Sequence, residues 1–183
     1  MEVFRSFFQN PRNFKFESQE KNEQVYFLLR RHPITNLGWI LAGIFFTFLP
    51  VFGLKFISAL YDDPFKIVPS QLQLILLIIW YMLTLLFTFE SFIIWYFNVY
   101  IITNKRVIDV DFTGFWGKRI SEASLDNVED ATYETNNLLH ILFDFGNISM
   151  QTAAEKPEFE FKSIPRPALV HDKLTDLVEA RKK

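Results

Sequence analysis

The sequence predicts an α+β membrane protein, in which a two-helix transmembrane hairpin is followed by a small β-barrel capped by a C-terminal α-helix. Three observations predict this class: two long apolar runs, a change from helical to alternating periodicity after Phe97, and one amphipathic segment near the end of the chain. A membrane helix needs about 20 mostly apolar residues to cross about 30 Å of hydrocarbon. Both apolar runs meet this requirement.

The two apolar runs set the expected domain boundaries. The first begins at Leu37 and fades near Leu60, and the second extends from Leu72 to Phe97 with Glu90 as its only acid. The chain is therefore expected to divide into an N-terminal cytoplasmic segment at residues 1–34, a transmembrane hairpin at 35–97 with spans at about 36–60 and 72–97, and a cytoplasmic domain at 98–183.

Basic residues flank the predicted hairpin on one side. Arg30 and Arg31 precede the first span, and four more basic residues follow the second, whereas the turn at residues 61–71 has only Lys66. Lys and Arg concentrate in cytoplasmic loops. We therefore expect a multi-pass plasma-membrane protein with both termini in the cytoplasm. The residues placed to form an aromatic belt at the membrane surfaces are Trp39, Tyr61, Trp95 and Tyr96.

Composition excludes several classes of function. Residues 98–183 carry 11 Lys and Arg against 14 Asp and Glu, and nucleic-acid binding needs a concentrated basic face. The chain has no cysteine, which excludes disulfides, thiol catalysis and zinc–thiolate sites. The three histidines are far apart and lack metal-ligand spacing. We expect no catalytic residue, no cofactor and no metal site, and no nucleic acid as a partner.

The segment after Phe97 alternates in the manner of β-strands. Strands are expected at residues 99–103, 106–112, 118–124, 128–135, 147–152 and 158–163, with turns at 104–105 and 113–117 and a short helical or irregular insert at 136–143. Pro167 begins an amphipathic helix whose apolar positions are Val170, Leu174, Leu177 and Val178. Such strands with one closing helix describe a small barrel.

The N-terminal residues leave two alternatives open. Residues 1–23 are polar with scattered Phe, and they either lie on the membrane surface or cover the domain, or else are poorly ordered. Glu23 to Arg30 is expected to form a short strand or helix. Pro33 disfavours helix at the residue before it, so the first span is expected to begin at Thr35 or Asn36.

Three segments after Phe97, one following another along the chain, carry sequence motifs. They are Tyr100-Ile-Ile-Thr-Asn-Lys-Arg-Val-Ile108, Ile120-Ser-Glu-Ala-Ser-Leu-Asp-Asn-Val-Glu-Asp130 and Asn137-Leu-Leu-His-Ile-Leu-Phe-Asp-Phe-Gly146. Together they resemble the bacterial pleckstrin-homology (PH-like) domains of small membrane proteins, over roughly residues 98–180. Ser124 stands where that family often has proline, and Phe143-Asp144 replaces a usual Leu-Gly. The resemblance implies a PH-like fold of seven strands plus a C-terminal helix, and no enzyme activity.

Basic and aromatic residues near the expected first turns are the candidate contact site. The candidates for lipid or partner contact are Lys105, Arg106, Phe115, Trp116, Lys118 and Arg119. They fall near the edge where eukaryotic PH relatives bind phosphoinositides, as the resemblance implies. Each basic residue near an anionic surface contributes about 1 kcal/mol. The alternative is that these bases only set the membrane topology.

Glu90 is the intramembrane acid. It lies about 27 Å along the second span, close to the expected cytoplasmic interface. From there it can reach water or pair with Arg30, Arg31 or His32. An interfacial anchor is favoured over a relay or transport role, although ionisable groups within spans are functional candidates.

These observations favour a non-catalytic module held at the cytoplasmic face by the lipid bilayer. Its expected activity is protein–protein interaction or self-assembly as a homo-oligomer, because tethering raises the effective concentration of weak contacts. The alternatives are recognition of anionic lipids by the PH-like domain, and an accessory subunit of a transporter or membrane enzyme.

Overall fold

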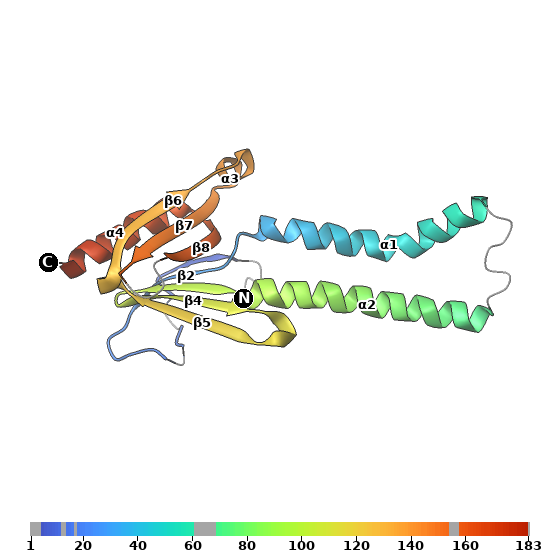
Figure 1. Ribbon diagram of the computed structural model, residues 1–183, viewed down its shortest axis with the longest axis horizontal. Helices are drawn as coiled ribbons and strands as arrows, with labels where there is room; N and C mark the ends of the chain where they lie inside the picture. Colours follow the sequence, from blue (N-terminus) through green and yellow to red (C-terminus); the bar gives the residue numbers. More distant parts are fainter. Residues whose placement is uncertain (1–4, 12–13, 17, 61–68, 154–157, 183) are drawn as a thin grey trace. The chain divides into compact units, whose positions relative to one another are not determined.

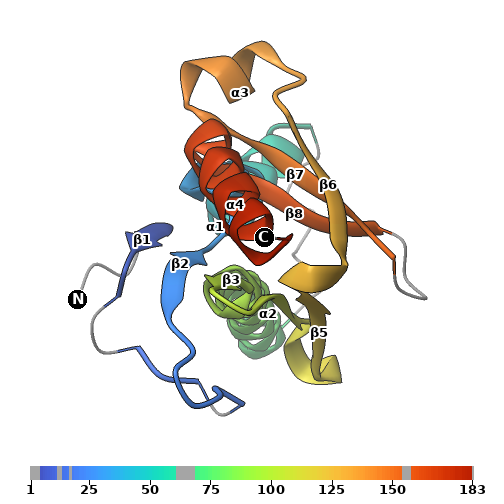
Figure 2. The ribbon, with the colours of Figure 1, turned by 90° about the vertical axis from the view of Figure 1, so that its left-hand side faces the viewer.

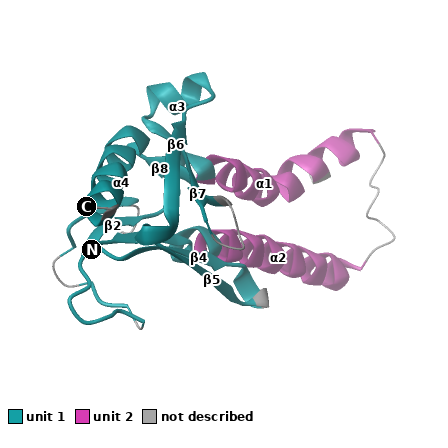
Figure 3. Cartoon of the chain, turned by 60° about the vertical axis from the view of Figure 1, so that its left-hand side comes forward, with its two compact units in different colours: residues 1–35, 94–183 teal, residues 36–93 magenta. Residues whose placement is uncertain are grey.

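A computed structural model describes residues 5–11, 14–16, 18–60, 69–153 and 158–182 (Figure 1). The chain divides into two compact units (Figure 3). One unit contains residues 1–35 and 94–183, and the other contains residues 36–93. The first unit thus combines segments from both sides of the apolar hairpin.

The hairpin consists of two helices, as expected. A short 3₁₀ helix, η1 (Pro33–Asn36), leads into α1 (Leu37–Leu60), and α2 follows at Ser70–Phe97. Both helices are long and apolar enough to cross a membrane. Their Leu, Ile and Phe side chains are largely exposed, as suits helices that are apolar all round. The expected turn at 61–71, with Tyr61 and Lys66, lies mostly outside the described residues.

The two helices approach closely at a glycine. A Cβ atom added at Gly43 would lie 3.0 Å from the Oγ1 of Thr88 on α2. Nearby, the indole N–H of Trp80 donates a hydrogen bond of 2.9 Å to the carbonyl of Phe46. Small residues let membrane helices approach, and polar side chains bond across the contact. Side chains within the hairpin therefore form contacts between α1 and α2.

Eight strands form two antiparallel sheets in the described part of the chain (Figures 1 and 2). The five-stranded sheet has the order β1 (Phe7–Gln9), β2 (Val25–Leu29), β3 (Val99–Thr103), β4 (Arg106–Phe112) and β5 (Lys118–Ser124). The three-stranded sheet has the order β6 (Val128–Glu134), β7 (Phe145–Thr152) and β8 (Glu158–Pro165). The remaining elements are η2 (Gly114–Trp116), η3 (Leu125–Asn127), α3 (Leu138–Leu142) and α4 (Pro167–Lys182).

The expectation of a closed barrel of seven strands is wrong, because the sheets do not close into a barrel and the number of strands differs. Six described strands follow Asn98, while β1 and β2 precede the hairpin, and the two sheets are separate. The segment Glu23–Arg30 was ambiguous because a run of this length fits a strand or a helical turn. As a strand, it pairs with the outer edge of β3, which would otherwise be left with open hydrogen-bonding groups.

The hairpin is inserted between two neighbouring strands. β2 and β3 are adjacent and antiparallel, with Leu29 opposite Tyr100. The chain between these partners contains α1 and α2, so the hairpin replaces the tight turn that usually joins such strands. Both connections to the hairpin therefore leave from the same end of the five-stranded sheet. We call this the proximal end, and the opposite end the distal end.

The main core lies between the two sheets and α4. It includes Phe27 and Ile102 from the five-stranded sheet and Phe161 from β8, all nearly inaccessible to solvent. α4 lies beside the three-stranded sheet (Figure 2) and contributes Val170, Leu174 and Val178, which recur every fourth residue along one helical face. The expected C-terminal amphipathic helix is confirmed.

A second apolar cluster covers the other face of the five-stranded sheet. Leu28, Ile101 and Ile108 form it, and Phe14 and Phe16 pack against them. Within the described residues, the phenylalanines near the N-terminus therefore cover the sheet. Covering the domain was one of the alternatives that the sequence left open.

Candidate functional site

Strand direction places the candidate residues at two ends of the domain. β3 begins at the proximal end, and the β3–β4 turn at Asn104-Lys105 therefore lies at the distal end. β4 returns, and Val110 pairs with Val99, so the β4–β5 turn lies at the proximal end. The structure brings Lys118 and Arg119 together at that end. It does not bring them together with Lys105 and Arg106, because a strand of this length separates the pairs by about 20 Å.

Arg106 is occupied by contacts within the domain. Its Nε lies 3.0 Å from Oε1 of Glu23, and its Nη1 lies 2.6 Å from Oε2 of Glu122. The Glu23 side chain has no exposed surface and also accepts a 2.9 Å hydrogen bond from Thr103 Oγ1. Burial raises the pKa of Glu23, but the hydrogen bonds from Arg106, the Glu20 N–H and Thr103 together lower it below its usual value.

Lys105 is also paired at the distal end. Its ammonium group lies 2.7 Å from Oε2 of Glu20 and donates a 3.2 Å hydrogen bond to the carbonyl of Lys21. Together with the Arg106 contacts, these bonds tie the loop before β2 to the β3–β4 turn. The two distal bases therefore have a structural role, which sequence position alone did not indicate.

The β4–β5 turn presents the proximal candidates. Phe115 is 74% exposed, and Lys118 and Arg119 are exposed at the start of β5. The side chain of Trp116 lies outside the described part of the structure. Gly117 has a φ of 120°, which a residue with a Cβ rarely adopts, and its carbonyl accepts a 2.9 Å hydrogen bond from Thr113 Oγ1.

The same turn packs against the point where α2 enters the domain. The rings of Phe97, the last residue of α2, and Phe112 lie 5.5 Å apart between centroids. The buried side chain of Asn98 accepts a hydrogen bond from the Phe112 N–H. These contacts hold the exposed turn beside the exit of the second hydrophobic helix.

Aromatic side chains fix both connections to the hairpin. Trp95 is buried, and its indole N–H donates a 2.9 Å hydrogen bond to the carbonyl of Arg31. The Arg30 guanidinium lies 4.2 Å from the centroid of the Tyr96 ring, a cation–π contact. Trp95 is thus packed within the domain and is not available to a membrane belt. Spacing along the span predicted only the depth of Trp95, and not its hydrogen bond to the segment that follows β2.

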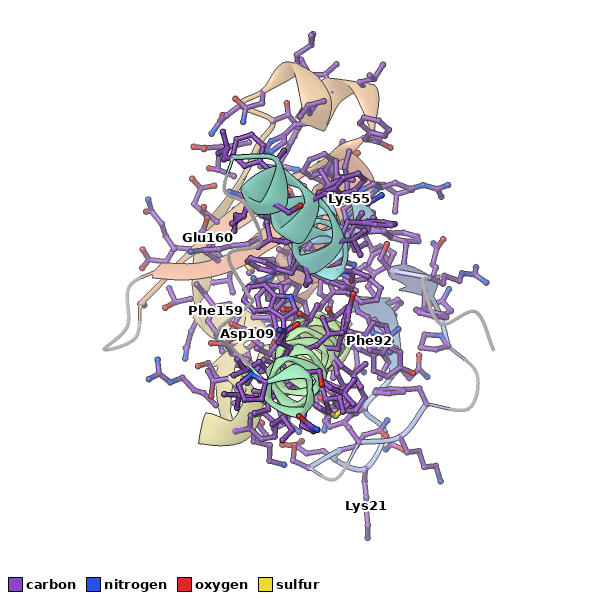
Figure 4. All side chains as sticks on the ribbon, turned by 90° about the vertical axis from the view of Figure 1, so that its right-hand side faces the viewer. Lys21, Lys55, Phe92, Asp109, Phe159 and Glu160 are labelled. Carbon is purple, nitrogen blue, oxygen red and sulfur yellow. The ribbon has the colours of Figure 1, made fainter. Side chains whose placement is uncertain are left out.

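Asp109 is a half-buried acid that the sequence interpretation missed. It shares a face of β4 with the core residue Val107, so it points between the sheets. Figure 4 shows it among the side chains of the domain, while Lys21 extends away from the loop. Burial, with a smaller effect from Asp111, raises the pKa of Asp109 to about 6, against the opposing effect of Arg31 and Lys162. The signal was present in the sequence, because the alternation Val107, Asp109, Asp111 puts acids on the core face.

Glu90 lies on α2, before the segment that enters the β domain, and is half-buried. Its pairing with a basic residue before α1 stays a prediction. Among the described residues, no group of His, Asp and Glu side chains has the geometry of a metal site.

These features define a β-sandwich module with a capping helix and an inserted apolar hairpin, which is a PH-like fold. The family model of the bacterial PH domain matches residues 37–178, and the chain therefore belongs to the bacterial PH domain family. This finding confirms the resemblance seen in the three motifs. The match indicates a non-enzymatic module, and no enzyme family is indicated.

Two solved structures resemble this chain. One is a DUF1696 family protein with a pleckstrin-homology domain from Shewanella loihica, 18% identical, with a TM-score of 0.33 over 45% of this chain and 68% of that one. The other is a pleckstrin-homology domain from Shewanella amazonensis, 17% identical, with a TM-score of 0.33 over 44% of this chain and 66% of that one. The comparison with curated proteins found no match.

Proposed function

We propose that this protein is a non-catalytic PH-like module anchored in the plasma membrane, with both termini in the cytoplasm, that binds a protein partner or a second copy of itself. The observation that carries the proposal is the insertion of the hairpin between β2 and β3. A single flexible tether would let a domain tumble. Here two connections join the domain to the hairpin, and Trp95 and Arg30 make contacts at the domain ends of these connections.

The charge arrangement favours a protein partner over an anionic headgroup. Arg106 and Lys105 are neutralised by carboxylates of the same domain, which leaves Lys118 and Arg119 as the exposed pair among the sequence-predicted bases. Two bases contribute about 2 kcal/mol near an anionic surface, which is small beside two membrane-spanning helices. In this proposal, Phe115, Lys118 and Arg119 contact the inner leaflet and orient the domain.

Affinity purification from native membranes in mild detergent, with quantitative mass spectrometry, tests the proposal. The matched control is the hairpin alone, residues 36–97, because it removes β2 together with the rest of the sheet. A protein enriched with the full chain and not with the hairpin supports partner binding. A discrete oligomer of the full chain by native mass spectrometry supports self-assembly, and a lone monomer with no enriched protein contradicts both.

Recognition of anionic lipid is the second candidate, and exposed Lys118 and Arg119 beside Phe115 are the observation in its favour. Its test is flotation of the β domain with phosphatidylglycerol vesicles. The domain needs residues 5–35 joined to 94–183 by a short linker, since residues 98–183 lack β2. Flotation that is lost in Lys118→Ala/Arg119→Ala, and not in Lys162→Ala/Lys173→Ala, supports lipid recognition.

A further inference from the structure

The insert between β6 and β7 carries an exposed apolar surface. Within α3, Leu138 is 82% exposed, Leu142 72%, Ile141 67% and Leu139 56%. Phe143, which follows, is also exposed. Side chains of this size normally contribute to a core, and a contiguous exposed group marks a contact with another molecule or with a membrane.

Ring contacts place this insert at the proximal end of the domain. His140 of α3 packs on Phe145 at 4.3 Å between ring centroids, and the same Phe145 stacks on His32 at 5.0 Å. His32 is held there by a 2.7 Å hydrogen bond from its N–H to the carbonyl of Ser163. Leu37, the first residue of α1, follows five residues later, so it lies within about 18 Å of His32 along the chain.

The proximal end therefore has two exposed apolar projections, one beside each exit of the hairpin. Phe115 lies on the turn that packs against the end of α2, and α3 lies beside the residues that lead into α1. The segment 136–143 contains no Asp, Glu, Lys or Arg, so entering a membrane interface would desolvate no formal charge on it. Arg30 and Lys118 supply positive charge at the same end, which complements anionic lipid headgroups.

We propose that α3 inserts into the interface of the membrane that the hairpin spans, with Leu138 and Leu142 among the acyl chains nearest the headgroups. This inference rests on the proposed function, because it requires α1 and α2 to cross that membrane. With Phe115, it gives the proximal end of the domain two lipid contacts. The paired contacts keep the proximal end against the bilayer and the distal end in water.

Fluorescence quenching in the full-length protein tests the depth of α3 directly. The chain has no cysteine, so a single cysteine can carry an environment-sensitive label without background. The probe site is Leu142→Cys, and the control is Ala180→Cys, an exposed site next to Arg181, whose guanidinium bonds the distal Asn104 carbonyl at 3.2 Å. A third site, Leu85→Cys on the exposed surface of α2, reports whether the hairpin itself is in lipid.

Each labelled protein is reconstituted in phosphatidylethanolamine–phosphatidylglycerol vesicles and quenched by nitroxide-labelled lipid or by iodide. We expect the labels at 142 and 85 to be quenched by nitroxide lipid severalfold more strongly than the label at 180, which iodide quenches. A label at 142 that iodide reaches, while the label at 85 stays in lipid, overturns the inference and leaves the proposed function standing. Shielding of residue 142 from both quenchers also overturns it, because protein then covers α3. A label at 85 outside lipid overturns both.

Discussion

The Glu23 carboxylate carries a charge without exposed surface, and it is tolerated because Arg106 and two further hydrogen-bond donors, the Glu20 N–H and Thr103 Oγ1, surround it. Sequence analysis placed Arg106 among the candidates for lipid or partner contact because it lies beside the first turn, near the edge that the family resemblance implies. Its partner stands more than eighty positions earlier in the chain, and no local pattern pairs them. A buried counter-charge of this kind is visible only in the folded structure.

Replacing Arg106 by Ala should destabilise the domain by about 3–5 kcal/mol, because Glu23 would be left as an unpaired buried charge. Chemical unfolding followed by tryptophan fluorescence in detergent measures the loss. Lys118→Ala removes an exposed base and should change the stability by less than about 0.5 kcal/mol. Equal effects of the two substitutions would contradict the structural role of Arg106.

The raised pKa of Asp109 predicts that the stability of the protein changes with pH in the opposite sense to that expected for a salt-bridged acid. Its pKa rises from 3.8 to about 6 on folding, so the folded protein binds a proton that the unfolded chain releases in that window. Stability should therefore fall as pH rises through this range and level off above it. Asp109→Asn should remove the fall and stabilise the protein by about 1–2 kcal/mol at neutral pH, after allowance for solvent screening.

The measurement is the unfolding free energy of both proteins across that pH range. Asp176→Asn, on the exposed side of α4, is the matched control and should keep the pH dependence of the parent chain. If Asp109→Asn destabilised the protein at neutral pH, the account of Asp109 as an acid that is only desolvated by folding would be contradicted.

At the scale of elements, most boundaries could be predicted because periodicity is a local property. Both hydrophobic helices, the strands from Val99 onward and the helix from Pro167 are close to their expected positions. The five residues of β2 could not be assigned because a short apolar run has no distinct period. Pairing between β2 and β3 was also hidden, since the two hydrophobic helices separate them in sequence.

The contact between α1 and α2 depends on the absence of a side chain at Gly43. Gly43→Ile should push α1 away from Thr88 and break the hydrogen bond from Trp80 to Phe46, lowering the stability of the hairpin by about 1–3 kcal/mol. Gly38→Ile adds the same side chain to open space on the same helix. Thermal denaturation in detergent compares them, and an equal effect at both positions would refute close packing at Gly43.

At the scale of the whole molecule, the β domain is built from two segments that flank the hairpin. Residues 5–35 joined to 94–183 by a flexible linker should therefore fold cooperatively without the hairpin, whereas residues 98–183 alone should not. The shorter chain loses Phe27 and Leu29 from the core, and burial of each such side chain contributes about 1.5–3 kcal/mol. Amide proton dispersion in NMR spectra distinguishes the two chains. A folded 98–183 fragment would show that β2 is dispensable.

The candidate site was less predictable than the fold, since a contact surface depends on which strand ends share a side. The β4–β5 turn was correctly expected at residues 113–117, but its position beside the end of α2 required the pairing of β3 with β4. The exposed leucines of α3 had no visible role in sequence, because apolar residues in a short insert ordinarily predict core. Strand pairing and the ring contacts of Phe145 place the β4–β5 turn and α3 at the same end of the domain.

Labelling of single cysteines in intact cells tests the central claim most directly, which is that the hairpin crosses the membrane and holds the β domain in the cytoplasm. Gln71→Cys, near the start of α2, and Ala180→Cys, on α4, are exposed sites in a chain without native cysteine. We predict that a membrane-impermeant maleimide labels residue 71 in intact cells and labels residue 180 only after permeabilisation. Labelling of both residues, or of residue 180 alone, in intact cells would contradict the account.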